Sequence, residues 1–204
     1  MYLKKGEWFL VIFNLAYILA FAFYYLNIKN YEFLWYVFVL LFFAMLIGGT
    51  LRKTNFDYIT LWGLSIWGLL HMSGGGIIVN GNVLYALEII KLFDIGDTYV
   101  LKFDQFVHAF GFGVTSLVAY HLLKPHLNSK ANYKIIYPLI FAIAIGAGAL
   151  NEIVEFLAVV SFPKTGVGGY YNTALDLVFN GIGSIIAILF VHFHYRRGKL
   201  VNKK

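Results

Sequence analysis

Six long apolar stretches divide this sequence, and they restrict its fold more than any other feature. A helix that crosses a bilayer needs about 20 predominantly apolar residues, and each stretch is long enough. The stretches cover residues 8–26, 31–50, 56–73, 104–123, 135–160 and 174–195. The sequence therefore predicts an all-α integral membrane protein, in which a single domain over residues 1–204 forms a bundle of six transmembrane helices.

Composition supports this fold class and excludes several kinds of site. The chain is 60% hydrophobic and only 13% charged, whereas soluble domains carry about 25% charged residues. It contains no cysteine, which excludes a disulfide framework, a thiolate metal site and a cysteine nucleophile. We expect a multi-pass protein of the cell membrane that has the lipid bilayer as its main partner.

The distribution of Lys and Arg predicts the orientation in the membrane. If the N-terminus is cytoplasmic, twelve of the 16 basic residues fall in cytoplasmic segments. Cytoplasmic loops carry such an excess, so both termini are expected in the cytoplasm. The outer lysines are Lys29, Lys91, Lys102 and Lys164. The net charge of +6 therefore reflects topology, and no nucleic-acid partner is expected.

A long outer loop, residues 74–101, connects the third and fourth stretches. It is about half apolar, and Leu84, Leu87 and Ile90 recur at helical spacing with charged residues between them. This pattern is typical of a short amphipathic helix that lies on a membrane surface. We expect such a helix at the outer leaflet.

Two glutamates, Glu152 and Glu155, lie within the fifth apolar stretch. One acidic residue at the centre of a membrane helix costs about 2.5 to 3.5 kcal/mol on insertion scales, so the pair needs a specific partner. With a rise of about 1.5 Å per residue, the predicted topology places both near the outer side. Neither capping nor the interface explains two carboxylates within one helix, which favours a functional site.

Polar residues of other stretches are expected at the same level. Asp104 and His108 are four residues apart at the start of the fourth stretch, so they share a helix face. The last stretch repeats this spacing with Asn172, Asp176 and Asn180. Ionisable residues inside a membrane normally face the bundle interior and pair or line a cavity. The sequence therefore predicts that these side chains meet near the outer leaflet.

We predict that the meeting point is a divalent metal site. Four carboxylates cannot stay ionised together in a low dielectric unless protons or a cation neutralise them. Mixed carboxylate and histidine donors suit Zn, Mn or Fe, and facing helices build such sites in bundles. The predicted ligands are Asp104, His108, Glu152, Glu155 and Asp176. Glu152 and Glu155 are also the predicted catalytic residues, as general bases. The predicted substrate-binding residues are His71, Lys102, Asn172 and Asn180.

Each of these residues also has a structural interpretation. Asp104 and Asp176 are expected in the first turns of helices, where acids cap free N–H groups and favour the helix dipole. A lone histidine such as His108 is more often a packing residue than a ligand. Asn151 and Asn180 could simply bond across helices. A purely structural polar cluster is thus one alternative to a functional site.

These motifs resemble those of the YjdF-like membrane proteins and, more distantly, the VanZ-like proteins. The pattern is a histidine with a following glycine, then Asp-x-x-x-His, then Ala-Leu-x-Glu-x-x-Glu, then an aspartate on the last helix. In this chain it is matched by His71, Asp104, His108, residues 149–155 and Asp176. The resemblance covers about residues 60–192 and implies the fold, the motif positions and a role in cell-envelope or lipid chemistry.

Two positions depart from the family pattern. The family often has a second aspartate where this chain has Asn172, which removes a possible anionic ligand. It also tends to carry an arginine near the first aspartate, where this chain has Lys102. The second departure weakens any argument for a phosphate-binding clamp.

Two functions from different classes are compatible with these features. The first is a metal-dependent enzyme, a hydrolase that acts on a lipid or cell-envelope substrate at the outer leaflet. The alternative is an ion- or proton-coupled transporter or binding protein that uses the buried carboxylates. Transport sites usually lie near the bilayer midplane, whereas these residues cluster outward, which favours the enzyme. The expected partner is a lipid or another small-molecule substrate.

Overall fold

The computed structural model describes residues 3–95, 98–128, 130–163 and 165–197. Lys164 and the basic residues of the tail 198–204, which contribute to the predicted charge asymmetry, lie outside the described residues. The six long helices are α1 (Lys5–Asn27), α2 (Tyr31–Thr54), α3 (Tyr58–Gly76), α4 (Phe103–Leu123), α5 (Tyr133–Ser161) and α6 (Tyr170–Phe190). α4 is followed by the short turn η2 (Lys124–His126), and α6 continues into η3 (Val191–Arg197), a π-helical segment.

The six long helices agree in number with the predicted bundle, and five of the predicted six spans are long and apolar enough to cross a membrane. The exception is α3, which has 19 residues and ends in His71, Ser73 and three glycines. These residues lower its mean hydropathy. Its small residues are buried against neighbouring helices, so α3 lies inside the bundle more than at its lipid-facing surface.

The prediction of an all-α fold is wrong for the long loop. Two antiparallel strand pairs occur there: β1 (Ile78–Val79) with β2 (Asn82–Val83), and β3 (Glu88–Ile95) with β4 (Thr98–Lys102). The expected amphipathic helix is reduced to one 3-10 turn, η1 (Leu84–Ala86).

Local sequence explains both hairpins. Asn80 and Gly81 have φ angles of 53° and 84°, and an Asn-Gly pair with two positive φ angles is the preferred turn of a two-residue hairpin. The next segment is rich in Ile, Leu and Phe, and β-branched and aromatic residues favour extended structure. Strand β3 is exposed along almost its whole length.

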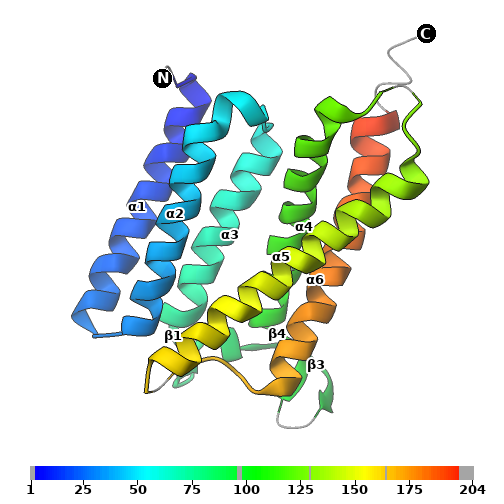
Figure 1. Cartoon of the computed structure of the whole chain (residues 1–204). Helices are drawn as coiled ribbons and strands as arrows, with labels where there is room; N and C mark the ends of the chain where they lie inside the picture. The colour runs from blue at the N-terminus through cyan, green and yellow to red at the C-terminus, as the bar shows by residue number, and fades with distance from the viewer. Residues whose placement is uncertain (1–2, 96–97, 129, 164, 198–204) are drawn as a thin grey trace.

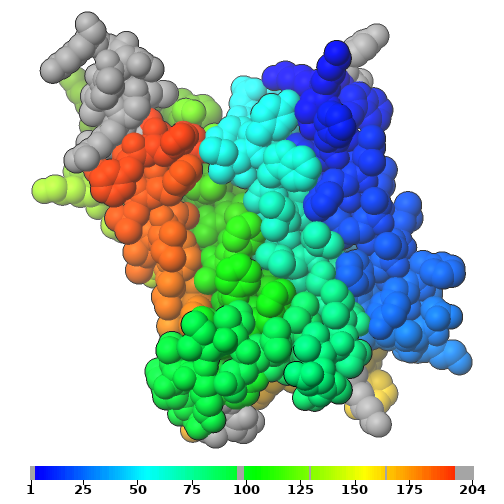
Figure 2. All heavy atoms as spheres, turned by 180° about the vertical axis from the view of Figure 1, so that it is seen from behind, coloured from blue at the N-terminus to red at the C-terminus, as the bar shows by residue number. Residues whose placement is uncertain are grey.

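The helices form two groups with α4 between them. α1, α2 and α3 lie side by side, and α5 crosses α4 and α6 diagonally (Figure 1). The start of α1 and the end of α6 lie at one end of the bundle, and the hairpins lie at the other (Figure 1). From behind, α3 and α4 run side by side above the hairpin residues (Figure 2). In its apolar window α4 is 61% buried, whereas α1, α2 and α5 are between 17% and 22% buried.

Glycines allow α4 and α6 to approach closely. A Cβ atom added at Gly183 would lie 2.6 Å from the carbonyl carbon and 2.9 Å from the Cα of Ala109. One at Gly113 would lie 3.1 Å from the carbonyl oxygen of Gly183. Small residues let helix backbones pack at this distance in membranes, and this contact fixes the distance between the two helices that carry Asp104 and Asp176.

We expect Gly183→Ala to destabilise the bundle, because its Cβ would meet backbone atoms that cannot rotate away. Overpacking of this kind costs about 1–3 kcal/mol, which a lower midpoint of thermal unfolding in detergent would report. Gly146→Ala is the matched control, since nothing lies within 4 Å of a Cβ at that position. Equal midpoints for the two variants would contradict this account of the α4–α6 contact.

Candidate functional site

All five predicted ligands meet at the hairpin end of the bundle. α4 contributes Asp104 and His108, α5 contributes Glu152 and Glu155, and α6 contributes Asp176. Donor atoms of Asp104, His108 and Asp176 lie within 4.8 Å of one another, and so do those of His108, Glu152 and Glu155. His108 therefore belongs to both triads, and the convergence expected from the spacing is present.

Asp176 is not a helix cap. α6 begins at Tyr170, four residues earlier than its predicted start at 174, so Asp176 lies in the second turn. Its side chain is 0% exposed. Asp104 does lie in the first turn of α4, as predicted. A helix-capping role therefore remains an alternative for Asp104 but does not explain Asp176.

The hydrogen bonds of His108 decide which nitrogen could bind a metal. Its Nδ1 lies 3.1 Å from Oδ1 of Asn180, and with the Asn180 amide in this orientation Nδ1 is the donor. The free electron pair is then on Nε2, which lies 3.7 Å from Oδ1 of Asp104. A ligating histidine commonly donates its other N–H in this way. The predicted substrate-binding residue Asn180 thus orients His108.

Lys102 and Asn172 link the two aspartates. Lys102 Nζ donates to Oδ1 of Asn172 and lies 3.4 Å from Oδ2 of Asp104. Asn172 Nδ2 donates to Oδ2 of Asp176 at 2.5 Å and to Oδ2 of Asp104 at 3.2 Å. Both were predicted to bind substrate, and here they hold one oxygen of each carboxylate.

Several buried carboxylate oxygens have no hydrogen-bond partner among the described residues. They are Oδ1 of Asp176 and both oxygens of Glu152, which the side chains of Asn151 and Thr173 approach without a well-formed hydrogen bond. Glu152 Oε1 lies 3.9 Å from Nδ1 of His108, too far for a hydrogen bond. An unpaired buried charge is strongly unfavourable, so these oxygens are where a cation, a proton or a water would be stabilised.

Glu7, a buried glutamate at the other end of the bundle, has hydrogen-bond partners for both of its carboxylate oxygens. Glu7 Oε1 and Oε2 accept from Arg52 at 2.7 and 2.5 Å, and Oε2 also accepts from the backbone N–H of Lys4 at 2.7 Å. Burial in this bundle therefore does not by itself prevent a carboxylate from being fully paired. The incomplete pairing around Glu152 and Asp176 distinguishes the site from such a contact.

His71 lies beside the cluster and lines a small cavity with His108. The cavity has a volume of about 10 Å³ and is also lined by Trp67, Phe112 and Asn151, among others. This is close to the minimum volume that holds one water molecule. His71 stacks on Trp67 with ring centroids 5.7 Å apart, so its ring is fixed at the cavity wall.

Sequence reasoning missed Tyr85, which holds His71 in place. The Tyr85 hydroxyl lies 2.9 Å from the carbonyl oxygen of His71 and 2.5 Å from Nδ1 of the same residue. Burial raises the pKa of Tyr85 well above its usual value, so the hydroxyl keeps its proton. Which of the two His71 atoms accepts the hydroxyl proton depends on the tautomer of His71. No pattern in the long loop distinguishes Tyr85 from its other aromatic residues.

Asn151 bonds within its own helix and not across helices. Its Nδ2 donates to Oε1 of Glu155 at 2.8 Å, which leaves Glu155 better satisfied than Glu152. Asn151 and Glu155 are four residues apart and share a helix face, so this contact could have been predicted from the sequence. The two glutamates therefore differ in environment, and Glu152 is the one with free oxygens.

We expect Tyr85→Phe to destabilise the protein, because it leaves Nδ1 and the carbonyl of His71 without their partner. Such a loss costs about 1–3 kcal/mol and would lower the midpoint of thermal unfolding. Tyr99→Phe is the matched control: its hydroxyl donates to the carbonyl of Ala86 at an exposed position, where water can replace it. A midpoint for Tyr85→Phe as high as that of Tyr99→Phe would contradict the role given to Tyr85.

Comparison with known proteins identifies the family. The family model described as Predicted membrane protein (DUF2238) matches residues 9–197, a range that contains every residue of the site. This match is consistent with the YjdF-like resemblance and shows no relation to the VanZ-like proteins. No match was found among curated proteins or among solved structures. The chain therefore belongs to the family of predicted membrane proteins DUF2238.

Proposed function

We propose that the protein is a metal-dependent membrane enzyme, a hydrolase that acts on a lipid or cell-envelope substrate. The observation that carries the proposal is the set of buried, unpaired carboxylate oxygens on Glu152 and Asp176 beside the oriented imidazole of His108. Four carboxylates converge there, and Lys102 is the only cation of the described residues that pairs with them. A divalent ion would remove this imbalance directly.

Asp104, His108 and Asp176 fit such an ion best. One ring nitrogen of His108 and one carboxylate oxygen of each aspartate lie within 4.8 Å of one another, a donor set that suits Zn, Mn or Fe. Bonds of about 2.0–2.2 Å to one ion would bring the donors to roughly 3–4 Å apart, so the side chains need only a small further approach. Lys102 and Asn172 hold the outer oxygens of the carboxylates and so preorganise the set.

Glu152 is the proposed general base. Its two oxygens are buried and unpaired, and its Oε1 faces His108, so it can accept a proton from a water held in the site. When bound, the metal would activate that water and polarise the carbonyl or phosphoryl group of the substrate. Glu155, which accepts from Asn151, has the supporting role of keeping the local charge negative.

The proposed location of the site is the extracytoplasmic leaflet. Two facts support it: twelve of the 16 basic residues fall on the opposite side of the predicted topology, and the site residues belong to the helix ends next to the hairpins. Lipid and envelope precursors of the outer leaflet would reach a site at this depth without crossing the bilayer.

Elemental analysis of the purified protein tests the proposal. We expect near-stoichiometric Zn, Mn or Fe in the parent protein and loss of that metal in His108→Ala and Asp176→Asn, because each variant removes one donor. Glu88→Gln is the matched control, since Glu88 is an exposed acid on β3 at the same end of the bundle.

Parent protein that retains no metal after purification and add-back would contradict the proposal. The carboxylates would then be neutralised by protons, and a flux that depends on a proton gradient in vesicles would favour the transporter.

A further inference from the structure

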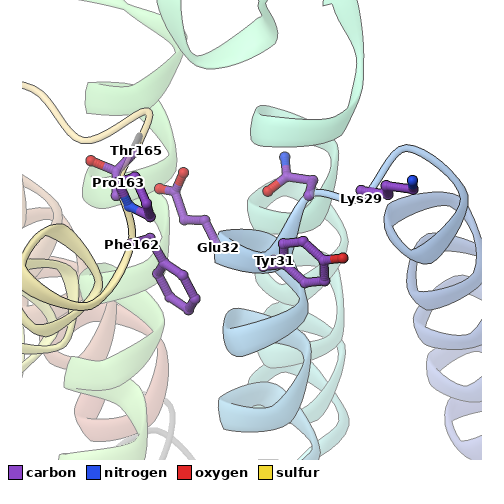
Figure 3. Close-up of a pocket in the computed structure, with 7 residues that line it drawn as sticks. Lys29, Tyr31, Glu32, Phe162, Pro163 and Thr165 are labelled. Atoms are coloured by element: carbon purple, nitrogen blue, oxygen red, sulfur yellow. The ribbon is translucent and has the colours of Figure 1, made fainter.

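A second cavity lies at the same end of the bundle, outside the carboxylate site. Its volume is about 450 Å³, within the range of about 300–1,000 Å³ that is common for small-molecule sites. It lies between the α1–α2 turn and the segment that follows α5. Its lining residues are Lys29, Asn30, Tyr31, Glu32, Phe162, Pro163 and Thr165 (Figure 3).

Glu32 is the most informative residue of this cavity. Its side chain extends from α2 toward Pro163 and Thr165 (Figure 3), and the residue is only 8% exposed. Oε2 accepts from the backbone N–H of Gly166 at 2.8 Å. Within the described part of the chain, no Lys or Arg forms an ion pair with this carboxylate. A buried carboxylate on a cavity wall favours a ligand that carries a positive charge.

The other lining residues restrict the ligand further. The ring of Phe162 lies beside Glu32, and the ring of Tyr31 lies between Glu32 and Lys29 (Figure 3); aromatic faces attract ammonium groups. Lys29 lies on the far side of Tyr31 from Glu32 (Figure 3), where its ammonium can pair with an anion. The cavity thus offers a negative and a positive group at separate places in one space.

The position of the cavity indicates the source of the ligand. It is built from the end of α1, the start of α2 and the chain after α5, and all three helices are long and apolar enough to span the membrane. The ends of spanning helices lie at the level of the lipid headgroups. We propose that this cavity binds the headgroup of a zwitterionic phospholipid, in which Glu32 pairs with the ammonium group and Lys29 pairs with the phosphate.

This proposal does not rest on the metal site, although the two sites are close. Tyr36 lies one turn after Glu32 on α2, and its ring packs against that of His71 with centroids 5.4 Å apart. Neither Tyr36 nor His71 lines the cavity, so a headgroup bound there need not contact the carboxylate site.

Native mass spectrometry of the full chain in detergent tests the proposal with phosphatidylethanolamine and phosphatidylglycerol of identical acyl chains. We expect the parent to prefer phosphatidylethanolamine. Glu32→Gln should lower that affinity about tenfold or more, because it loses a charge-assisted hydrogen bond, and should not weaken phosphatidylglycerol. The glutamine oxygen can still accept from Gly166, so the fold is preserved. Lys29→Ala should weaken both lipids, since both carry a phosphate.

Glu88→Gln, on the exposed strand β3, is the control and should leave both affinities unchanged. Equal affinities of the parent for the two lipids, or equal effects of Glu32→Gln and Glu88→Gln, would overturn the proposal. Soluble phosphoethanolamine should compete only weakly. Competition as strong as that of the whole lipid would show a site for a free solute and would also overturn it.

Discussion

The balance of charge around His108 is the constraint on which the rest of this structure depends. Asp104, Glu152, Glu155 and Asp176 approach one another in a bundle built for lipid, and Lys102 is the one cation of the described residues that contacts them. The fold does pair a buried carboxylate fully elsewhere, as the Glu7–Arg52 contact shows. The incomplete pairing of Glu152 and Asp176 is therefore not imposed by burial in the bundle.

The close packing of the helices determines the geometry of the site. Gly183 brings α6 against the backbone of Ala109 on α4, and this approach places Asp176 beside Asp104. Gly148 has the corresponding role on α5, where an added Cβ would lie 3.1 Å from Cγ of Asn180. Asn180 in turn fixes the proton on His108. A change in helix separation would thus alter the tautomer and the spacing of the proposed ligands together.

The sequence was sufficient for the helices and for the convergence of the acids. Apolar length defines a spanning helix, and spacings of three and four residues define its faces, so Asp104, His108, Glu152, Glu155 and Asp176 could be placed on the correct faces. The hairpins were missed because the apolar residues after Leu84 fit two periodicities, although Asn80 and Gly81 are a turn signal.

The periodicity of the sequence could not predict other contacts at this end of the bundle. Tyr85 reaches His71 and Gly166 reaches Glu32 through contacts between residues far apart in the sequence. Such contacts depend on how loops fold over helix ends. Glu32 also lies in the first turn of α2, where an acid is expected for reasons of helix electrostatics alone, so its place in a cavity had no separate signal.

The most direct measurement of the central claim is anomalous diffraction from crystals of the protein grown with Mn²⁺ or Zn²⁺. We expect one strong anomalous peak between Nε2 of His108 and the carboxylates of Asp104 and Asp176. Well-ordered side chains at these residues with no peak between them, in crystals that hold the metal in solution, would contradict it. The carboxylates would then be kept neutral by shared protons.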